Sequence, residues 1–234
     1  MFFWETIKLL FSQAPHPLAQ RNHQLFKSFD PSQTIESYEF VVFDTELTGL
    51  DTSHDEIVSI AAVRIKSMQI LIDQSFHSLL CAGKKQVGQG TFVHKITPEQ
   101  IKGAPDPKDV LPRFFDYCGS SVLVGHLPEL DFSFLDKKCA KVMGGSIHNP
   151  CLDSMALAKT LWKKHERLKD KRFPEIDSFN LVELSRVCAI PLFPSHSALG
   201  DALQTACLFF FLVERLKELG MKSFRDFYKA GGVR

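Results

Sequence analysis

The chain has 234 residues, enough for one domain of generous size or for a smaller domain with a terminal appendage. Hydrophobic residues make up 44% and charged residues 24%, a globular profile that excludes a fibre or an intrinsically disordered chain. The net charge of +1 provides no global positive field, so any nucleic-acid binding must come from a local patch or from bound metal.

Two further features bear on the environment of the protein. The six cysteines are dispersed and form no C-x-x-C motif, so we expect reduced thiols and a cytoplasmic location. No apolar run reaches the roughly 18 residues that a membrane-spanning helix needs, so we expect no membrane span.

Residues 1–35 are predicted to form an N-terminal helical extension, with the main domain at 36–234. One amphipathic helix is followed by polar, proline-containing sequence from Ala14 onward. We expect the apolar face of this helix to pack on its own domain, with docking on a protein partner as the alternative. That face consists of Phe2, Phe3, Trp4, Leu9, Leu10 and Phe11.

The main domain opens with apolar or alternating runs at residues 38–43, 57–65 and 70–80. Their period indicates strands, and the short links between them predict an antiparallel meander. Helical patterns then begin near Thr97 and Lys108, and residues 121–125 are typical of a short buried strand. Because helices cross over before this strand, we expect mixed pairing.

From Glu129 onward the pattern is helical, at about 130–143, 153–168, 179–189 and 197–219, with a possible last turn at 224–230. Strands come first and helices later. This order predicts an α/β domain in which helices flank a mixed sheet.

Two carboxylates follow the first apolar strand. Asp44 and Glu46 come directly after residues 40–43, and a period of two places both on one face of the strand. Like charges at the edge of a core raise each other's pKa, and a divalent cation removes that cost. The alternative is a solvated turn at Thr48 and Gly49, because an isolated D-x-E motif is weak evidence.

Asp131 follows the strand at 121–125, in the first turn of a predicted helix. Its alternative role is to favour a helix N-terminus. His196 and Asp201 lie at the start of the long late helix, where Ser195 or Ser197 can act as the cap. They converge only if His196 lies on the loop and Asp201 lies one turn inside the helix.

Each of these acids alone has an ordinary explanation, but their positions agree. Carboxylates at a strand end, at the next strand–helix junction and at a late helix start all occupy the edge where open sheets build sites. Their coincidence favours a site over independent surface positions.

These motifs resemble those of the DEDDh branch of the DnaQ-like 3′→5′ exonucleases, which includes DNA polymerase III epsilon subunits, over about residues 40–218. The matching stretches are Phe43-Asp44-Thr45-Glu46-Leu47-Thr48-Gly49-Leu50, Gly125-His126 through Leu130-Asp131-Phe132-Ser133-Phe134-Leu135, and His196 to Ala202, with weaker matches at His94-Lys95-Ile96-Thr97 and Cys151-Leu152-Asp153-Ser154. Leu47, Leu127 and Lys95 stand where the family commonly has threonine, asparagine and glycine. These departures leave every catalytic side chain in place.

The resemblance implies a ribonuclease H-like mixed five-stranded sheet flanked by helices. It also implies two Mg²⁺ or Mn²⁺ ions, held by Asp44, Glu46, Asp131 and Asp201. His196 would take a proton from the attacking water, and the product would be a nucleoside 5′-monophosphate. The expected substrate contacts are Leu47, Thr48, Gly49, Leu50 and His94. Leu50 is either a wedge beneath the last base or an ordinary core residue.

The implied partner is a nucleic-acid 3′ end, with single-stranded DNA favoured over RNA. An RNA-trimming enzyme using the same site is one alternative, because nothing in the motifs reads the 2′-hydroxyl. A catalytically silent nucleic-acid or protein-binding module is another. One local basic stretch suits phosphate contacts or a solvated helix face. Its members are Lys159, Lys163, Lys164, Arg167, Lys169, Lys171 and Arg172.

Overall fold

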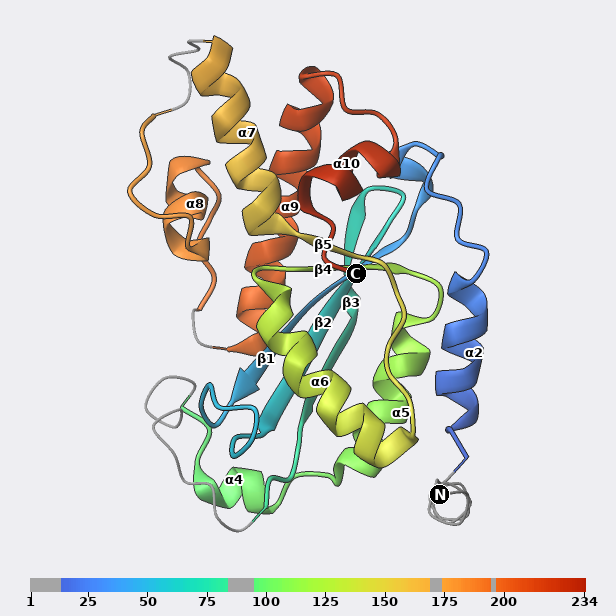
Figure 1. The fold of residues 1–234 in the computed structure, drawn as a ribbon. Coiled ribbons are helices and arrows are strands. Elements are labelled where there is room, and N and C mark those ends of the chain that lie inside the picture. Colours follow the sequence, from blue (N-terminus) through green and yellow to red (C-terminus); the bar gives the residue numbers. More distant parts are fainter. Residues whose placement is uncertain (1–13, 84–94, 169–173, 195–196) are drawn as a thin grey trace, which may run out of the picture.

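The computed structural model describes residues 14–83, 95–168, 174–194 and 197–234 (Figure 1). Within these residues one sheet contains β1 (Phe40–Leu47), β2 (Ile57–Lys66), β3 (Gln69–Leu79), β4 (Val122–Gly125) and β5 (Cys151–Asp153). The strand order is β3-β2-β1-β4-β5. The first three strands pair antiparallel, and β4 and β5 continue the sheet in parallel with β1. The predicted meander and the mixed five-stranded sheet are confirmed.

Helices cover both faces of this sheet. They are α2 (Pro17–Phe26), α4 (Pro98–Lys102), α5 (Pro107–Cys118), α6 (Pro128–Met143), α7 (Ser154–Leu168), α8 (Leu181–Val187), α9 (Ala198–Glu218) and α10 (Phe224–Gly231), with a 3-10 turn at Ile35–Ser37. Helix α9 lies along one face with α7 against it, and α5 and α6 cover the other (Figure 1). None of the described helices is long and apolar enough to cross a membrane.

The alternation of side chains along β1 divides the core into two layers. Phe40 and Val42 pack beneath α9, whereas Val41 and Phe43 pack beneath α5 and α6. The same alternation continues beyond the apolar residues, because β1 runs on to Leu47. At the end of this strand, Asp44 and Glu46 therefore point toward the α9 face, and Thr45 points toward the face covered by α5 and α6.

The helices expected at about 130–143 and 153–168 leave residues 144–152 unassigned, and β5 forms at residues 151–153, so the expected helix is wrong at Asp153 alone. This strand pairs with β4 on one side, and on the other Val233 N donates to Cys151 O at 3.0 Å. Three residues are too few to show a period of two, so the pattern gave no strand signal. The strand is nevertheless the fifth that the family resemblance implied.

Helix α2 lies within the stretch that was expected to be polar and irregular. Pro17 occupies the first helical position, where its missing N–H costs nothing, and His16 Nδ1 accepts from Leu18 N at 3.2 Å. The sequence pattern predicts only polar, proline-containing chain after Ala14, whereas in the structure one of these prolines begins a helix. The predicted helix before it and its apolar face fall on residues 1–13, outside the described residues.

Candidate active site

Three carboxylates converge at the carboxyl-terminal end of β1. Asp44 and Glu46 share one face of the strand, and Asp201 lies in the first turn of α9, which covers that face. One oxygen from each of the three lies within 4.8 Å of the others. All three side chains are partly buried, so the solvated-turn alternative for Asp44 and Glu46 is wrong.

Asp131 reaches the same edge from the opposite face of the sheet. It lies in the first turn of α6 and is 9% exposed. Its Oδ1 accepts a hydrogen bond from Thr45 N at 3.1 Å and a second from the Thr45 hydroxyl. Three of the four predicted acids therefore form a cluster, and Thr45 holds the fourth, Asp131, beside it.

Burial and mutual repulsion act together on these groups. Burial raises the pKa of Asp44 well above its usual range, and the charges of Asp131 and Asp201 raise it further. Burial, followed by the same two charges, raises the pKa of Glu46 to about 7. Burial raises the pKa of Asp131 to about 6, although the Thr45 hydrogen bonds act in the opposite direction.

This donor set fits a hard divalent cation. Among the described residues, no donor reaches Glu46 Oε1, which is buried. The cluster offers carboxylate oxygens alone, the ligands that Mg²⁺ and Mn²⁺ prefer. A cation at this position would offset the cost of burying these charges and the repulsion between them.

The loop between β1 and β2 carries most of the predicted substrate contacts. Thr48 Oγ1 donates to Asp55 Oδ1 at 2.8 Å, and Asp51 N donates to Asp55 Oδ2 at 2.9 Å, so Asp55 ties the loop together. Leu50 lies on this loop and is 76% exposed. The interpretation of Leu50 as a core residue is therefore wrong.

Two predicted site residues, His94 and His196, fall outside the described residues. The chain that flanks His196 contacts the start of α9: Asp201 N donates to Ser197 O at 2.9 Å, and Pro194 O lies against Gly200. A Cβ on Gly200 would come 2.2 Å from that oxygen, so glycine is required there. Ser197 occupies the predicted N-cap position, although its side chain makes no capping hydrogen bond.

Sequence reasoning missed Thr45 and Asp55 as parts of this site. The alternation of β1 indicated that Thr45 points away from its two neighbours. Its partner Asp131 lies 86 positions further along, and no local pattern joins the two. Asp55 follows three residues that are ordinary in a surface turn, so its role depends on the folded loop.

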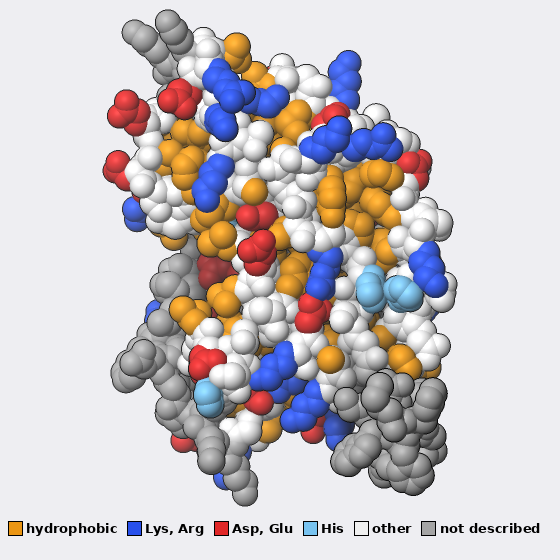
Figure 2. Space-filling model, viewed as in Figure 1, with side chains coloured by type: hydrophobic (Ala, Val, Ile, Leu, Met, Phe, Trp, Pro, Cys, Tyr) orange, Lys and Arg blue, Asp and Glu red, His pale blue; other side chains and the backbone are white. Residues whose placement is uncertain are grey.

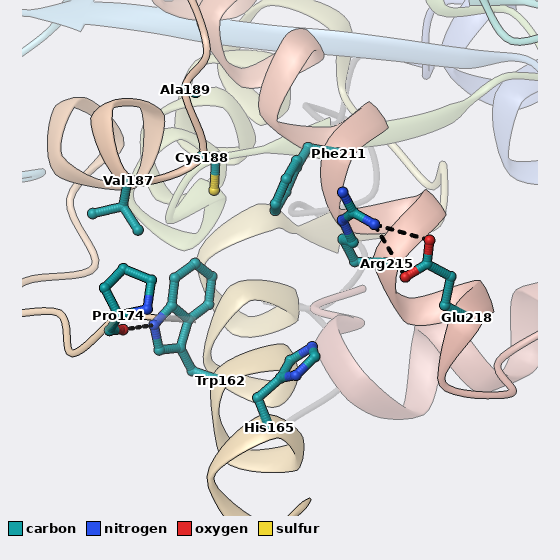
Figure 3. Close-up of a pocket in the computed structure, with 9 residues that line it drawn as sticks. All are labelled: Trp162, His165, Pro174, Val187, Cys188, Ala189, Phe211, Arg215 and Glu218. Atoms are coloured by element: carbon teal, nitrogen blue, oxygen red, sulfur yellow. Dashed lines mark hydrogen bonds and ion pairs between the residues drawn. The ribbon is translucent and has the colours of Figure 1, made fainter. Parts of the chain in front are cut away.

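A cavity of about 250 Å³ lies elsewhere, between α7, the end of α8 and the second half of α9. Figure 3 shows Trp162, whose Nε1 donates to Pro174 O at 3.1 Å, and Arg215, which pairs with Glu218 at 2.9 Å. Arg215 follows Asp201 by four turns of α9, a distance of about 21 Å at 1.5 Å per residue. This cavity is therefore separate from the acidic cluster.

The described part of the basic stretch lies toward the outer end of α7. Lys159, Lys163 and Arg167 are exposed there, and Lys and Arg side chains gather in this region in Figure 2. Lys159 Nζ lies 5.9 Å from the ring centroid of Phe179. Lys169, Lys171 and Arg172 fall outside the described residues.

Comparison with known proteins places this geometry in a family. The model of the RNase_T family, described as exonuclease, matches residues 41–209. The PolC-type DNA polymerase III of Caldanaerobacter subterraneus subsp. tengcongensis is 34% identical over 188 residues, which are 79% of this chain and 12% of the relative. The chain spans 12% to 14% of the length of the first three such polymerases. The DNA polymerase III subunit epsilon of Aquifex aeolicus is 31% identical over 76% of this chain and 81% of its own.

Solved structures agree on the fold. E. coli Exonuclease I in complex with a dT13 oligonucleotide has a TM-score of 0.67 at 16% identity, covering 78% of this chain and 42% of its own. Exonuclease X in complex with 5′ overhanging duplex DNA has a TM-score of 0.59 at 23% identity, covering 82% and 99%. The sheet order, the acidic edge and the family match together place this chain in the RNase_T exonuclease family.

Proposed function

We propose that this chain is a divalent-metal-dependent 3′→5′ exonuclease that releases nucleoside 5′-monophosphates from DNA ends. The observation that carries the proposal is the approach of Asp44, Glu46 and Asp201 within 4.8 Å at the carboxyl edge of the sheet. Three partly buried acids at this spacing repel one another, and burial and neighbouring charge raise the pKa values of Asp44 and Glu46, so the arrangement is costly unless a cation joins them. Relatives named as DNA polymerase III components, and fold neighbours solved with DNA, support DNA as the polymer.

Asp44, Glu46 and Asp201 would hold the ions, two Mg²⁺ or Mn²⁺, and Asp131 would contribute from the other face of the sheet. When bound, these ions supply Lewis-acid catalysis for phosphodiester hydrolysis. The chain's own part is to keep the acids in place with rigid elements, a strand end and two helix starts. His196 is our candidate for the general base that takes the proton of the attacking water.

Leu47, Thr48, Gly49, Leu50 and His94 are our candidates for contacts with the terminal nucleotide. The exposure of Leu50 supports this role. Its side chain is 76% exposed beside an acidic site and so offers an apolar surface to a base or sugar. We also propose that residues 36–234 form the catalytic domain and that residues 1–35 are an extension able to contact a protein partner.

The test uses the purified full chain and matched single-stranded DNA and RNA oligomers, labelled at the 5′ end or at the 3′ end. With Mg²⁺, the proposal predicts a descending ladder from the 5′ label and immediate mononucleotide release from the 3′ label. EDTA should abolish both. Preference for RNA would assign the same chemistry to the other polymer, and internal cuts would contradict the exonuclease assignment.

Two variants assign the activity to the site. Asp44→Asn should abolish it while the chain stays folded. Asp73→Asn makes the same chemical change at an exposed position on β3 and should leave it unchanged. Activity in purified Asp44→Asn protein equal to that of Asp73→Asn would show that the acidic cluster is not the catalytic centre.

A further inference from the structure

We infer that Thr45 is a positioning residue that fixes which carboxylate oxygen of Asp131 faces the acidic cluster. The inference rests on the proposed metal site. Thr45 stands between Asp44 and Glu46 in sequence, yet the alternation of β1 directs it to the other face of the sheet, where α6 brings Asp131.

The contact between Thr45 and Asp131 is largely buried and consists of two hydrogen bonds. Thr45 is 8% exposed and Asp131 is 9% exposed. The Thr45 backbone N–H and the Thr45 hydroxyl both donate to the same oxygen, Oδ1. Both bonds end on Oδ1, which leaves Oδ2 as the oxygen that can serve a cation.

Two hydrogen-bond donors on one oxygen restrict the orientation of a carboxylate more than a single donor does. A single bond lets a carboxylate turn about it, whereas two donors from different directions restrict that turn. Outer partners of this kind orient metal-binding carboxylates, and their loss typically weakens metal binding by about 10-fold to 100-fold. Strand β1 therefore supplies two of the three cluster acids directly and, through Thr45, orients Asp131 beside them.

The backbone donor and the hydroxyl donor can be separated by substitution. Any residue except proline at position 45 provides the N–H, but of the small residues only threonine and serine provide the hydroxyl as well. Thr45→Val keeps the branched shape and removes the second bond. Thr45→Ser removes a methyl group and keeps both bonds.

The test measures Mn²⁺ binding to the metal-free full chain by electron paramagnetic resonance of the free ion. Thr45→Val should raise the Kd for Mn²⁺ by about 10-fold or more, whereas Thr45→Ser should bind close to the wild type. Thermal melting in EDTA provides a second readout. A purely structural role would lower the melting temperature of Thr45→Val and leave Mn²⁺ binding unchanged, which would overturn the inference.

Two comparisons keep the result decisive. If Thr45→Val does not fold, Thr45→Ala removes the same hydroxyl without a methyl group in its place and is judged by the same criterion. Asp44→Asn reports on the metal site itself. Wild-type Mn²⁺ affinity in Asp44→Asn would overturn the proposed function and this inference together, whereas lost affinity there with unchanged affinity in the Thr45 variants would overturn this inference alone.

Discussion

The Asp55 carboxylate lies directly against Gly49, so that a Cβ at Gly49 would come 2.3 Å from Asp55 Oδ2. Asp55 is held there by the Thr48 hydroxyl and the Asp51 N–H. We therefore expect Gly49→Ala to displace Asp55 and loosen the loop that presents Leu50. Because the acids on β1 and α9 are held independently of this loop, KM for an oligonucleotide should rise more than kcat falls.

Steady-state kinetics on a single-stranded oligonucleotide checks this expectation. Gly83→Ala is the matched control, because a Cβ at Gly83 would meet nothing within 4 Å. Equal KM values for the two alanine variants would mean that the packing of Asp55 on Gly49 has no part in substrate binding.

Leu50→Ala should weaken binding of substrate without weakening the fold. A side chain that is 76% exposed contributes little to folding stability, so the melting temperature should stay within a degree or so of the wild type. If the leucine packs against the terminal nucleotide, KM should rise several-fold, in line with about 1 kcal/mol for a lost apolar contact. Ile72→Ala, at a 61% exposed position on β3, should change neither quantity.

The raised pKa of Glu46 predicts how the metal-free protein responds to pH. Its pKa is about 7 in the fold and lies near 4.3 in an unfolded chain, so between these values the folded state keeps a proton that the unfolded state has lost. The free energy of unfolding in EDTA should therefore fall as the pH rises from about 4.3 to about 7. Above that window the full cost of the buried charge remains, and Mg²⁺ should remove much of it.

Calorimetry in EDTA and in Mg²⁺ between about pH 5 and about pH 8 measures this effect. Glu46→Gln carries no titrating group at this position, so its melting temperature in EDTA should decline less steeply and should respond less to Mg²⁺. A wild-type melting temperature that rises with pH in EDTA would contradict the assigned direction of the shift.

The positions of the acids could be predicted because local rules determine them. A period of two places Asp44 and Glu46 on one face, and helix-start signals place Asp131 and Asp201 at the ends of their helices. The sequence could not indicate that Asp131 arrives from the opposite face. That arrangement depends on α6 and α9 covering different sides of the sheet, which is a property of the whole topology.

The parts that were missed are short or depend on distant partners. Strand β5 has three residues, and its pairing with β4 defines it more than its own pattern does. Helix α2 begins at Pro17, a residue that can start a helix or prevent one, and contacts with the rest of the domain decide between the two. Asn22 and Asn149, which join α2 to the domain, are 127 positions apart.

Asn22→Ala should destabilise the protein by about 1–3 kcal/mol, because it leaves buried polar groups without partners. Asn22 is 3% exposed; its side chain donates to Asn149 Oδ1 at 2.5 Å and accepts from His148 N at 2.6 Å. Urea unfolding measures the loss, and Gln24→Ala, at an exposed position of the same helix, is the control. Activity per folded molecule should be unchanged. Equal stabilities of the two variants would show that α2 is not fastened by this contact.

Leu127→Asn should stabilise the protein, because Leu127 has a left-handed backbone with φ 58° and ψ 48°. Asparagine adopts that conformation more readily than leucine, for which it costs about 1 kcal/mol, and asparagine is the residue that the resembled family commonly has here. The side chain is 51% exposed, so little packing is lost. Leu130→Asn makes the same change at a 40% exposed position inside α6, where asparagine is the poorer helix former. Urea unfolding should show a gain for the first variant and a loss for the second, and the reverse order would mean that Leu127 contributes packing that outweighs its backbone strain.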